Sequence, residues 1–346
     1  MIPRTAAALA RELAGQFKVV AIIGPRQSGK TTMARAVFSS LPYVSLEAPD
    51  ERDLAQADPR GFLARFPAGG VIDEAQRCPD IFSYIQGIVD AKKQPGQFIL
   101  TGSQHFGLMQ GLTQSLAGRI GFVQLLPFSA GELAAAGLLA AERETSLLRG
   151  GYPPIYDQPV DPARWLDAYI TTYVERDVRQ LLNVRDLGAF QLFTRLCAGS
   201  TGQLLNLSRI GTEVGIDQKT ARAWLGVLES SFIVFRLQPH WQNFRKRITK
   251  APKLYFYDSG LAARLLGIEE ERQLLTHPLK GALFETWVVA ELLKNLANRG
   301  RKNNLYFWRS HDGHEIDILA EKGTGLLPLE IKSGATLVDE WFKPLE

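Results

Sequence analysis

The chain has 346 residues, enough for two or more domains with buried cores, and its 45% hydrophobic and 22% charged residues exclude disordered, fibrous and disulfide-rich classes. Its two cysteines, Cys78 and Cys197, form no metal-ligand pair, and no apolar run approaches the ~18 residues of a membrane span, so we expect a soluble cytoplasmic protein without structural zinc. The net charge of +4 is concentrated locally, because residues 236–253 carry six basic side chains and no acidic one.

A phosphate-binding loop is predicted between the apolar run 19–23 and a helix expected from Thr32 onward. Residues 24–31 read GPRQSGKT and match the GxxxxGK[ST] pattern. A strand, a glycine-rich loop and a helix in this order aim backbone N–H groups at one point, where a phosphate binds. Lys30 would neutralise the β- and γ-phosphates, and Thr31 would hold magnesium. A glycine-rich turn without a ligand is the alternative, which this context disfavours. The expected nucleotide-binding residues are Gly24, Pro25, Arg26, Gln27, Ser28, Gly29, Lys30, Thr31 and Thr32, together with Asp73.

The second part of such a site is a strand that ends in acidic residues, and residues 70–74 (GVIDE) supply it. Asp73 is expected to bind magnesium. Glu74 is expected to orient and deprotonate the attacking water, because hydrolysis needs a positioned nucleophile as well as a charge clamp. A further strand is predicted over 98–101, and Ser103, which follows it, is placed to sense the γ-phosphate.

A single arginine precedes the next predicted strand. Arg119 stands directly before residues 120–125, the position at which ring-forming ATPases place an arginine finger that reaches the γ-phosphate of a neighbouring subunit. A surface arginine with no catalytic role is the alternative. As a finger, Arg119 implies a homo-oligomer, such as a ring, and joins Lys30, Glu74 and Ser103 in the catalytic set.

These motifs and their spacing resemble one protein family. The sequences GPRQSGKTT, VIDEAQ, LTGSQ and LAGRI, followed by LLPFSAGEL, are similar to the AAA-type P-loop ATPases of bacteria and archaea that carry a conserved C-terminal domain of unknown function. Further likeness lies in residues 150–154 (GGYPP), 173–178 (YVERDV) and 250–261 (KAPKLYFYDSGL), so the resemblance covers nearly the whole chain. It implies an AAA-type parallel sheet, ATP and Mg²⁺ as cofactors, and a lid element near the adenine, for which Gly151 and Pro153 are candidates. A simple turn explains GGYPP equally well.

A helix-turn-helix is predicted in the middle of the chain. From 207 to 230 apolar residues recur at helical spacing on both sides of a tight turn at Gly215, and Asp217 is a good N-cap for the second helix. Strand-like runs at 232–237 and 254–257 follow, with the basic segment between them, as in a winged helix. A solvated basic loop, or a winged helix that packs or binds a partner, are the alternatives. The expected DNA contacts are Gln218, Lys219, Arg222, Arg245, Lys246, Arg247 and Lys250.

Acidic residues in the C-terminal part fall on buried faces of predicted elements. Apolar residues stand three, four and seven positions after Glu285, so this carboxylate lies on the apolar face of its helix and must be paired or coordinate a cation. In the strand 315–319 Asp317 points opposite to the isoleucines, while Glu330 and Lys332 share one side of the next strand. Two adjacent strands would therefore bring these three side chains together.

A helical glutamate, an aspartate and an ExK motif are similar to the restriction-endonuclease-like fold. The resemblance implies a magnesium site formed by Glu285, Asp317 and Glu330, with Lys332 positioning water and stabilising charge on the phosphate. An inactive copy that contacts DNA or a partner is the alternative. Such folds usually continue through another helix and strand, so a truncated or trimmed domain is one expectation.

We expect an α/β protein of four parts: an AAA-type P-loop core at 1–135, a helical lid or linker at 136–195, a winged helix at 196–266 and an α/β restriction-endonuclease-like domain at 267–346. The predicted function is ATP binding and hydrolysis coupled to action on DNA by an oligomer, without membrane contact. The rival is a nucleotide-switched signalling or scaffold protein whose C-terminal domains bind protein partners. A small-molecule kinase is disfavoured, because the extra domains and Arg119 would have no role in it.

Overall fold

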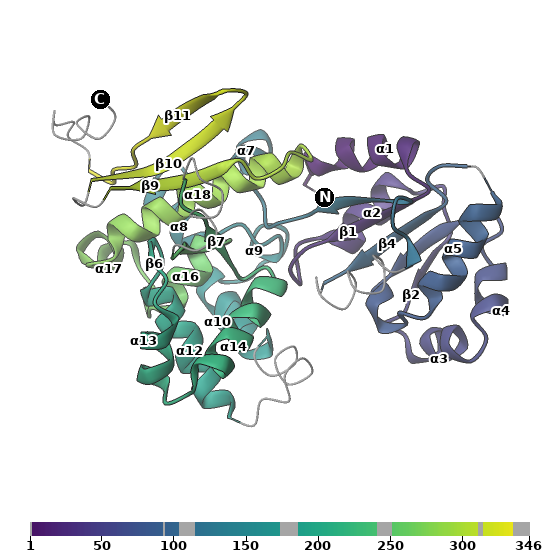
Figure 1. The fold of residues 1–346 in the computed structure, drawn as a ribbon, viewed down its shortest axis with the longest axis horizontal. Coiled ribbons are helices and arrows are strands. Elements are labelled where there is room, and N and C mark those ends of the chain that lie inside the picture. Colours follow the sequence, from purple (N-terminus) through teal and green to yellow (C-terminus); the bar gives the residue numbers. More distant parts are fainter. Residues whose placement is uncertain are drawn as a thin grey trace. The chain divides into compact units, whose positions relative to one another are not determined.

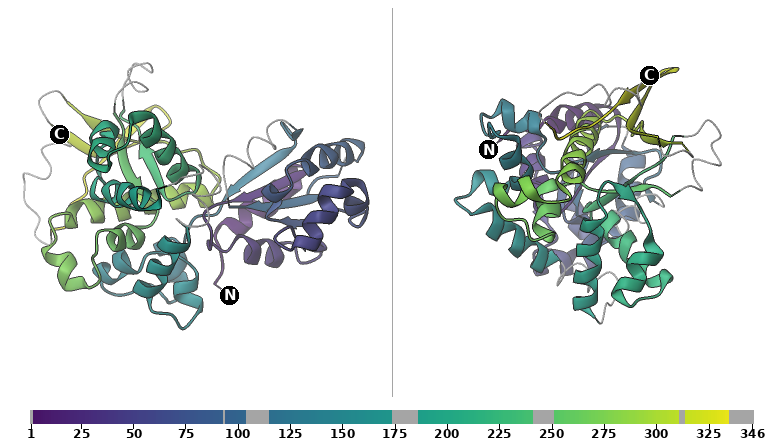
Figure 2. Two further views of the ribbon diagram at one scale, coloured as in Figure 1. Left: turned by 90° about the horizontal axis from the view of Figure 1, so that it is seen from below. Right: turned by 90° about the vertical axis from the view of Figure 1, so that its left-hand side faces the viewer.

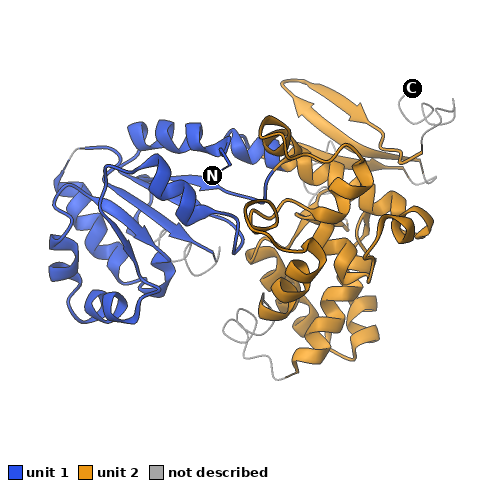
Figure 3. Ribbon diagram, turned by 180° about the vertical axis from the view of Figure 1, so that it is seen from behind, with its two compact units in different colours: residues 1–128, 294–302 blue, residues 129–293, 303–346 orange. Residues whose placement is uncertain are grey.

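Two compact units make up the chain, residues 1–128 with 294–302 and residues 129–293 with 303–346 (Figure 3). Four residues predicted to contact DNA, Arg245, Lys246, Arg247 and Lys250, lie outside the described residues, as does most of the motif at 173–178. The computed structural model describes residues 2–92, 94–103, 115–173, 186–240, 251–310 and 314–334.

The first unit is built on a parallel sheet with the strand order β2-β3-β4-β1-β5 (Figure 1). Its strands are β1 (Val19–Ile23), β2 (Tyr43–Ser45), β3 (Gly70–Asp73), β4 (Phe98–Gly102) and β5 (Ile120–Gln124). β4 pairs in parallel with both β1 and β3, so the carboxyl ends of these three strands lie next to one another. Ligands bind at this edge in open α/β sheets. The predicted α/β class is confirmed, as are the strands predicted at 19–23, 70–74, 98–101 and 120–125, whereas β2 was not predicted.

Helices cover both faces of this sheet (Figure 2). On one face, Ala6, Ala10 and Met33 pack against Val20 and Ile22 of β1. Because both faces are covered, all of β1 is buried, and the strand reads as a continuous apolar run rather than as an alternation. The helices of this unit are α1 (Ala6–Gln16), α2 (Lys30–Val37), α3 (Pro49–Ala57), α4 (Pro59–Ala64), the 3₁₀ turn η1 (Ala75–Arg77) and α5 (Ile81–Ala91).

The second unit has a core of its own, to which the predicted lid, the helix-turn-helix and the start of the C-terminal part all contribute. Phe190, Phe193 and Trp224 meet in edge contacts, and Tyr152 and Leu283 belong to the same core. None of the described helices is both long and apolar enough to cross a bilayer. Outside the helix-turn-helix, the helices are α7 (Ala130–Ala135), α8 (Arg143–Arg149), α9 (Pro154–Asp157), α10 (Pro162–Tyr173), α12 (Leu187–Gly199), α16 (Ser259–Leu265), α17 (Glu271–Thr276) and α18 (Lys280–Asn298), whose last residues belong to the first unit.

The GGYPP segment is held by a buried aspartate. Gly150 adopts φ +67°, and a Cβ there would lie 2.2 Å from the carboxylate of Asp258, so only glycine fits. The Gly151 N–H donates to Asp258 at 2.7 Å, and Asp258 also caps α16. Packing within the second unit thus accounts for these glycines, and a role of Gly151 and Pro153 near the adenine stays a prediction.

The predicted pair of helices is present as α13 (Leu207–Val214) and α14 (Gln218–Ser230). Gly215 ends α13 with φ +82°, and the side chain of Asp217 accepts from the Thr220 N–H at 2.8 Å, as expected of an N-cap. A Cβ on Gly211 would already lie 3.1 Å from the Ile216 carbonyl oxygen, so a small residue permits this tight turn. The turn and the cap predicted here are confirmed.

Two antiparallel sheets complete the second unit. β6 (Gln203–Leu204), β7 (Val234–Leu237) and β8 (Lys253–Phe256) form the order β6-β8-β7, and β9 (Leu305–Arg309), β10 (Glu315–Lys322) and β11 (Gly325–Leu329) form the order β11-β10-β9. β7 and β8 are the strands expected beside the basic segment.

The C-terminal sheet departs from the expected alternation. A register shift between Ile316 and Leu319 interrupts the pairing of β10 with β9, and Asp317, Ile318 and Leu319 are all buried. β11 ends at Leu329, so Glu330 and Lys332 follow the strand instead of lying within it.

Candidate functional site

The predicted phosphate loop leaves the carboxyl end of β1 and enters α2. Gly29 is the N-cap of α2 with φ +87°, and Gln27 also has a positive φ. Left-handed residues in such a turn form a concavity of backbone N–H groups that binds anions. A Cβ on Gly24 would lie 2.1 Å from the Leu125 carbonyl oxygen, so glycine is required where the loop leaves the sheet.

Two buried side chains make this loop fit a nucleotide phosphate. The ammonium of Lys30 donates to the Pro25 carbonyl at 2.6 Å and so lies against the loop. Ser28 is fully buried, and among the described residues its Oγ has no hydrogen-bond partner. A buried hydroxyl without a partner is rare in folded proteins and marks a place for a ligand oxygen.

Arg4 supports the loop from the N-terminal segment. Its guanidinium donates to the carbonyl oxygens of Ser28 at 2.7 Å and of Leu126 at 2.6 Å. It also lies over the ring of Phe128. No sequence motif signals a residue that acts through backbone carbonyls, so the sequence gives no prediction for Arg4.

Thr31 and Asp73 lie together, as predicted. Thr31 Oγ1 is 2.9 and 3.0 Å from the two carboxylate oxygens of Asp73, which is buried at the end of β3. Thr101 of β4 also donates to Asp73, and Tyr43 Oη donates to it at 3.0 Å. A hydroxyl beside a carboxylate offers the oxygen ligands that magnesium prefers, so these residues fit a magnesium ion.

Glu74 follows Asp73 in a left-handed conformation with φ +54°. Its backbone N–H donates to Thr101 Oγ1 at 3.2 Å, and its carboxylate accepts from Gln76 Nε2 at 2.6 Å. The same amide nitrogen is 3.4 Å from Ser103 Oγ. Gln76 therefore links the predicted base to the predicted sensor, a role that only the fold reveals.

Replacing Tyr43 with phenylalanine is expected to raise the magnesium concentration needed for half-maximal ATP turnover by about 3- to 10-fold, because one hydrogen bond to the Asp73 carboxylate is lost. Burial and the neighbouring Asp73 raise the pKa of Tyr43 to about 12, so this phenol stays a donor at neutral pH. The half-exposed Tyr84 on α5, replaced in the same way, is the matched control. An unchanged magnesium requirement in Tyr43→Phe would contradict this role.

Arg119 lies at the amino-terminal end of the parallel strands, whereas the phosphate loop of the same chain lies at their carboxyl-terminal end. It precedes β5, whose first residue pairs with Val19 at the start of β1, and a five-residue strand spans about 16 Å. The guanidinium makes two hydrogen bonds to Asp90, at 2.6 and 2.8 Å, and these bonds lower the pKa of Asp90. Arg119 thus does not serve the nucleotide site of its own chain in this arrangement.

Three of the predicted DNA contacts form one exposed surface. Gln218, Lys219 and Arg222 are exposed in the first turns of α14, whereas Ala221 and Trp224 of the same helix are buried. Arg222 stands four positions after Gln218 and three after Lys219, so it neighbours both side chains on one side of the helix.

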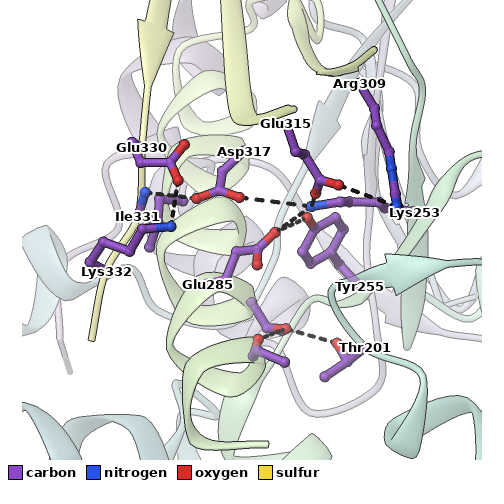
Figure 4. Close-up of polar contacts among 12 residues, drawn as sticks. Thr201, Lys253, Tyr255, Glu285, Arg309, Glu315, Asp317, Glu330, Ile331 and Lys332 are labelled. Atoms are coloured by element: carbon purple, nitrogen blue, oxygen red, sulfur yellow. Dashed lines mark hydrogen bonds and ion pairs between the residues drawn. The ribbon is translucent and has the colours of Figure 1, made fainter. Parts of the chain in front are cut away.

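The predicted C-terminal residues meet around a lysine from another strand (Figure 4). Lys253 of β8 is 3% exposed, and its Nζ is 3.0 Å from Glu285 Oε1 on α18 and 3.9 Å from Asp317 Oδ1 on β10. It also pairs with Glu315. Tyr255, two residues along β8, donates to Glu285. Glu285 and Glu315 raise the pKa of Lys253 although burial acts in the opposite direction.

Asp317 and the ExK motif lie side by side at the other end of this cluster (Figure 4). Asp317 accepts from the Ile331 N–H at 2.8 Å, and Lys332 pairs with Glu330. Burial and the neighbouring Glu285 raise the pKa of Asp317 to about 6. The proximity of Asp317, Glu330 and Lys332 that the sequence predicts is therefore present.

The predicted magnesium centre of Glu285, Asp317 and Glu330 is not formed. Across the described ranges, no three histidine, cysteine, aspartate or glutamate side chains come close enough to share a metal ion. Lys253 and Tyr255 both donate hydrogen bonds to Glu285 Oε1. The charge pattern predicts Lys253 as part of the basic segment. The sequence signal for its actual role is a lysine and a tyrosine two positions apart on one face of an otherwise apolar strand.

Three family descriptions match successive parts of the chain. Residues 16–134 match a family described as an AAA domain. Residues 141–272 and 280–346 match two domains of unknown function, DUF8612 and DUF4143.

Two curated relatives match almost the whole chain. The uncharacterized proteins Rv2008c of Mycobacterium tuberculosis and Mb2031c of Mycobacterium bovis are each 35% identical over 336 residues, which cover 96% of this chain and 74% of the relative. Among solved structures, the Walker-type ATPase PABY2304 of Pyrococcus abyssi has a TM-score of 0.50 at 17% identity, covering 77% of this chain and 96% of that chain. This last likeness supports the fold alone.

Proposed function

The chain belongs to the family of AAA-domain proteins that includes Rv2008c and Mb2031c, and on this premise we propose that it hydrolyses ATP with magnesium and uses the nucleotide cycle to control its contact with DNA. The observation that carries the proposal is the contact of Thr31 with Asp73, beside Lys30 and Glu74 in the chain, at the carboxyl ends of β1 and β3, which flank β4 in the parallel sheet. This edge is where an open α/β sheet binds its ligand.

The residues of the first unit divide the work of hydrolysis. Backbone N–H groups of the loop and the Lys30 ammonium would hold the β- and γ-phosphates, and Thr31 and Asp73 would hold magnesium, which supplies positive charge to the phosphate oxygens when bound. Glu74 would orient the attacking water and accept its proton. Ser103, joined to Glu74 through Gln76, is placed to respond to the γ-phosphate.

Arg119 would act on the nucleotide of a neighbouring copy. Its position at the amino end of β5 supports a role in trans. The exposed ion pair between Arg119 and Asp90 is of a kind that contributes little stability, so Arg119 would lose little free energy by leaving Asp90 for a phosphate. The active form in this proposal is a homo-oligomer.

DNA contact is proposed for the exposed side of α14. Gln218, Lys219 and Arg222 occupy the first turns of the second helix of a helix-turn-helix, which is the part that enters the major groove in such proteins. The basic residues at 245–250 follow β7 along the chain and would add phosphate contacts. The proposal assigns no phosphodiester cleavage to the C-terminal cluster, because the described carboxylates there do not form a metal centre.

Charge reversal tests this surface. Lys219→Glu/Arg222→Glu is expected to weaken duplex binding by at least ~10-fold and to reduce the slope of log affinity against log salt by about 2, because two phosphate contacts are lost. Fluorescence anisotropy across a salt series measures both quantities. Arg11→Glu/Arg60→Glu, on exposed positions of the first unit, changes the net charge equally and is the matched control. Equal losses in both variants would assign the effect to net charge and not to α14.

A further inference from the structure

Lys253 joins three elements of the second unit that are far apart in sequence. It stands at the start of β8, and its ammonium contacts Glu285 on α18 and both Glu315 and Asp317 on β10 (Figure 4). Lys253 is 3% exposed, so its ammonium is shielded from water, whereas the side chains of Glu285 and Glu315 are 14% and 26% exposed. The ammonium also lies 5.6 Å from the ring of Phe307 on β9.

Buried carboxylates need a compensating charge. At a nuclease-like site a divalent cation supplies that charge. Here the charge is supplied by the chain itself, because the lysine nitrogen lies between the carboxylates of α18 and β10. Tyr255 donates to Glu285, and the Ile331 N–H donates to Asp317, so neutral donors complete the same set.

We propose that Lys253 takes the place of a divalent cation in this cluster, so that β8, α18 and β10 are tied together without metal. Glu285 and Glu315 are then structural partners of an ammonium and not metal ligands. The consequence is that the second unit keeps its stability when divalent cations are removed. This inference is independent of ATP hydrolysis and of DNA binding.

The first test asks whether the cluster takes a metal. The full chain carrying Asp73→Asn, which removes the carboxylate expected to bind metal at the phosphate loop, is titrated with MnCl₂ by calorimetry and melted with Mn²⁺ or with EDTA. We expect no binding heat and the same melting temperature in both conditions. Binding of one Mn²⁺ that is lost on adding Asp317→Asn would overturn the proposal.

The second test removes the ammonium. Lys253→Met is expected to lower the melting temperature by roughly 6 to 20 °C, because Glu285 and Asp317 lose their contact with the buried ammonium, while Glu315 keeps its pair with Arg309 at 3.5 Å. Lys322→Met, at the exposed end of β10, is the matched control and should melt like the wild type. Melting of Lys253→Met at the wild-type temperature would overturn the proposal.

A third variant keeps the proposal testable if Lys253→Met fails to fold. Adding Glu285→Gln and Glu315→Gln to Lys253→Met removes the ammonium together with the two carboxylate charges closest to it, so this triple variant should fold and recover most of the lost melting temperature. If the triple variant is as unstable as Lys253→Met alone, the role of Lys253 is packing, and the proposal is wrong.

Discussion

Replacing Glu74 with glutamine is expected to lower ATP turnover by roughly 10²- to 10⁴-fold while leaving ATP binding intact. The amide cannot accept the proton of the attacking water, but it keeps the size of the side chain and the hydrogen-bonding link through Gln76. Phosphate release measures turnover, and a fluorescent ATP analogue measures binding.

Lys30→Ala is the informative control for this experiment. It removes the ammonium that would hold the phosphates, so binding should fall together with turnover. The two variants therefore separate nucleotide binding from hydrolysis at one site. Wild-type turnover in Glu74→Gln would show that another group activates water, and the assignment of Glu74 would have to be abandoned.

Replacing Arg119 with alanine is expected to lower turnover by ~10³-fold or more under conditions in which the chain assembles, because an arginine finger stabilises the charge of the transition state. Binding of ATP should not change, since Arg119 lies away from the nucleotide site of its own chain. Asp90→Ala removes the partner of Arg119 but keeps the finger, so it should retain turnover.

Mixing two inactive variants tests the action in trans. A protomer with Arg119→Ala keeps its own Glu74, and a protomer with Glu74→Gln keeps its own Arg119, so an interface between them can combine both groups. We expect the mixture to recover part of the wild-type turnover, although each variant alone is inactive. Full turnover by Arg119→Ala alone would identify Arg119 as a surface residue.

The first unit could be predicted from the sequence largely because its signals are local. The phosphate loop follows β1, Asp73 ends β3 and Glu74 follows it, and parallel pairing then brings the strand ends together. The turn at Gly215 and the cap at Asp217 were predictable for the same reason, since a cap acts within three residues of its own position.

The residues that could not be predicted reach their partners across long stretches of chain. Arg4 donates to carbonyls of Ser28 and Leu126, and Tyr43 from the edge strand reaches Asp73. Backbone carbonyls and a single phenol carry no pattern in the sequence. Their roles depend on strand order, which the chain order of the elements does not state.

Lys253 shows that a run of basic residues in the sequence does not predict that each of them is exposed. Six basic residues between 236 and 253 predict an exposed basic segment, but charge density in the sequence says nothing about burial. Lys253 begins a buried strand and pairs with Glu285, which the helical pattern did place on a buried face. The pattern predicts that Glu285 is paired or coordinates a cation. The fold shows that the cation is a lysine.

Coupling of ATP hydrolysis to DNA is tested by steady-state ATP turnover with and without single-stranded, duplex and branched DNA, with Glu74→Gln as the inactive control. We expect that DNA stimulates turnover of the wild type, that one of these DNA forms stimulates it most, and that Lys219→Glu/Arg222→Glu loses the stimulation while keeping its basal turnover. Robust turnover that is indifferent to every DNA would rule out this coupling and favour a nucleotide switch regulated by a protein partner.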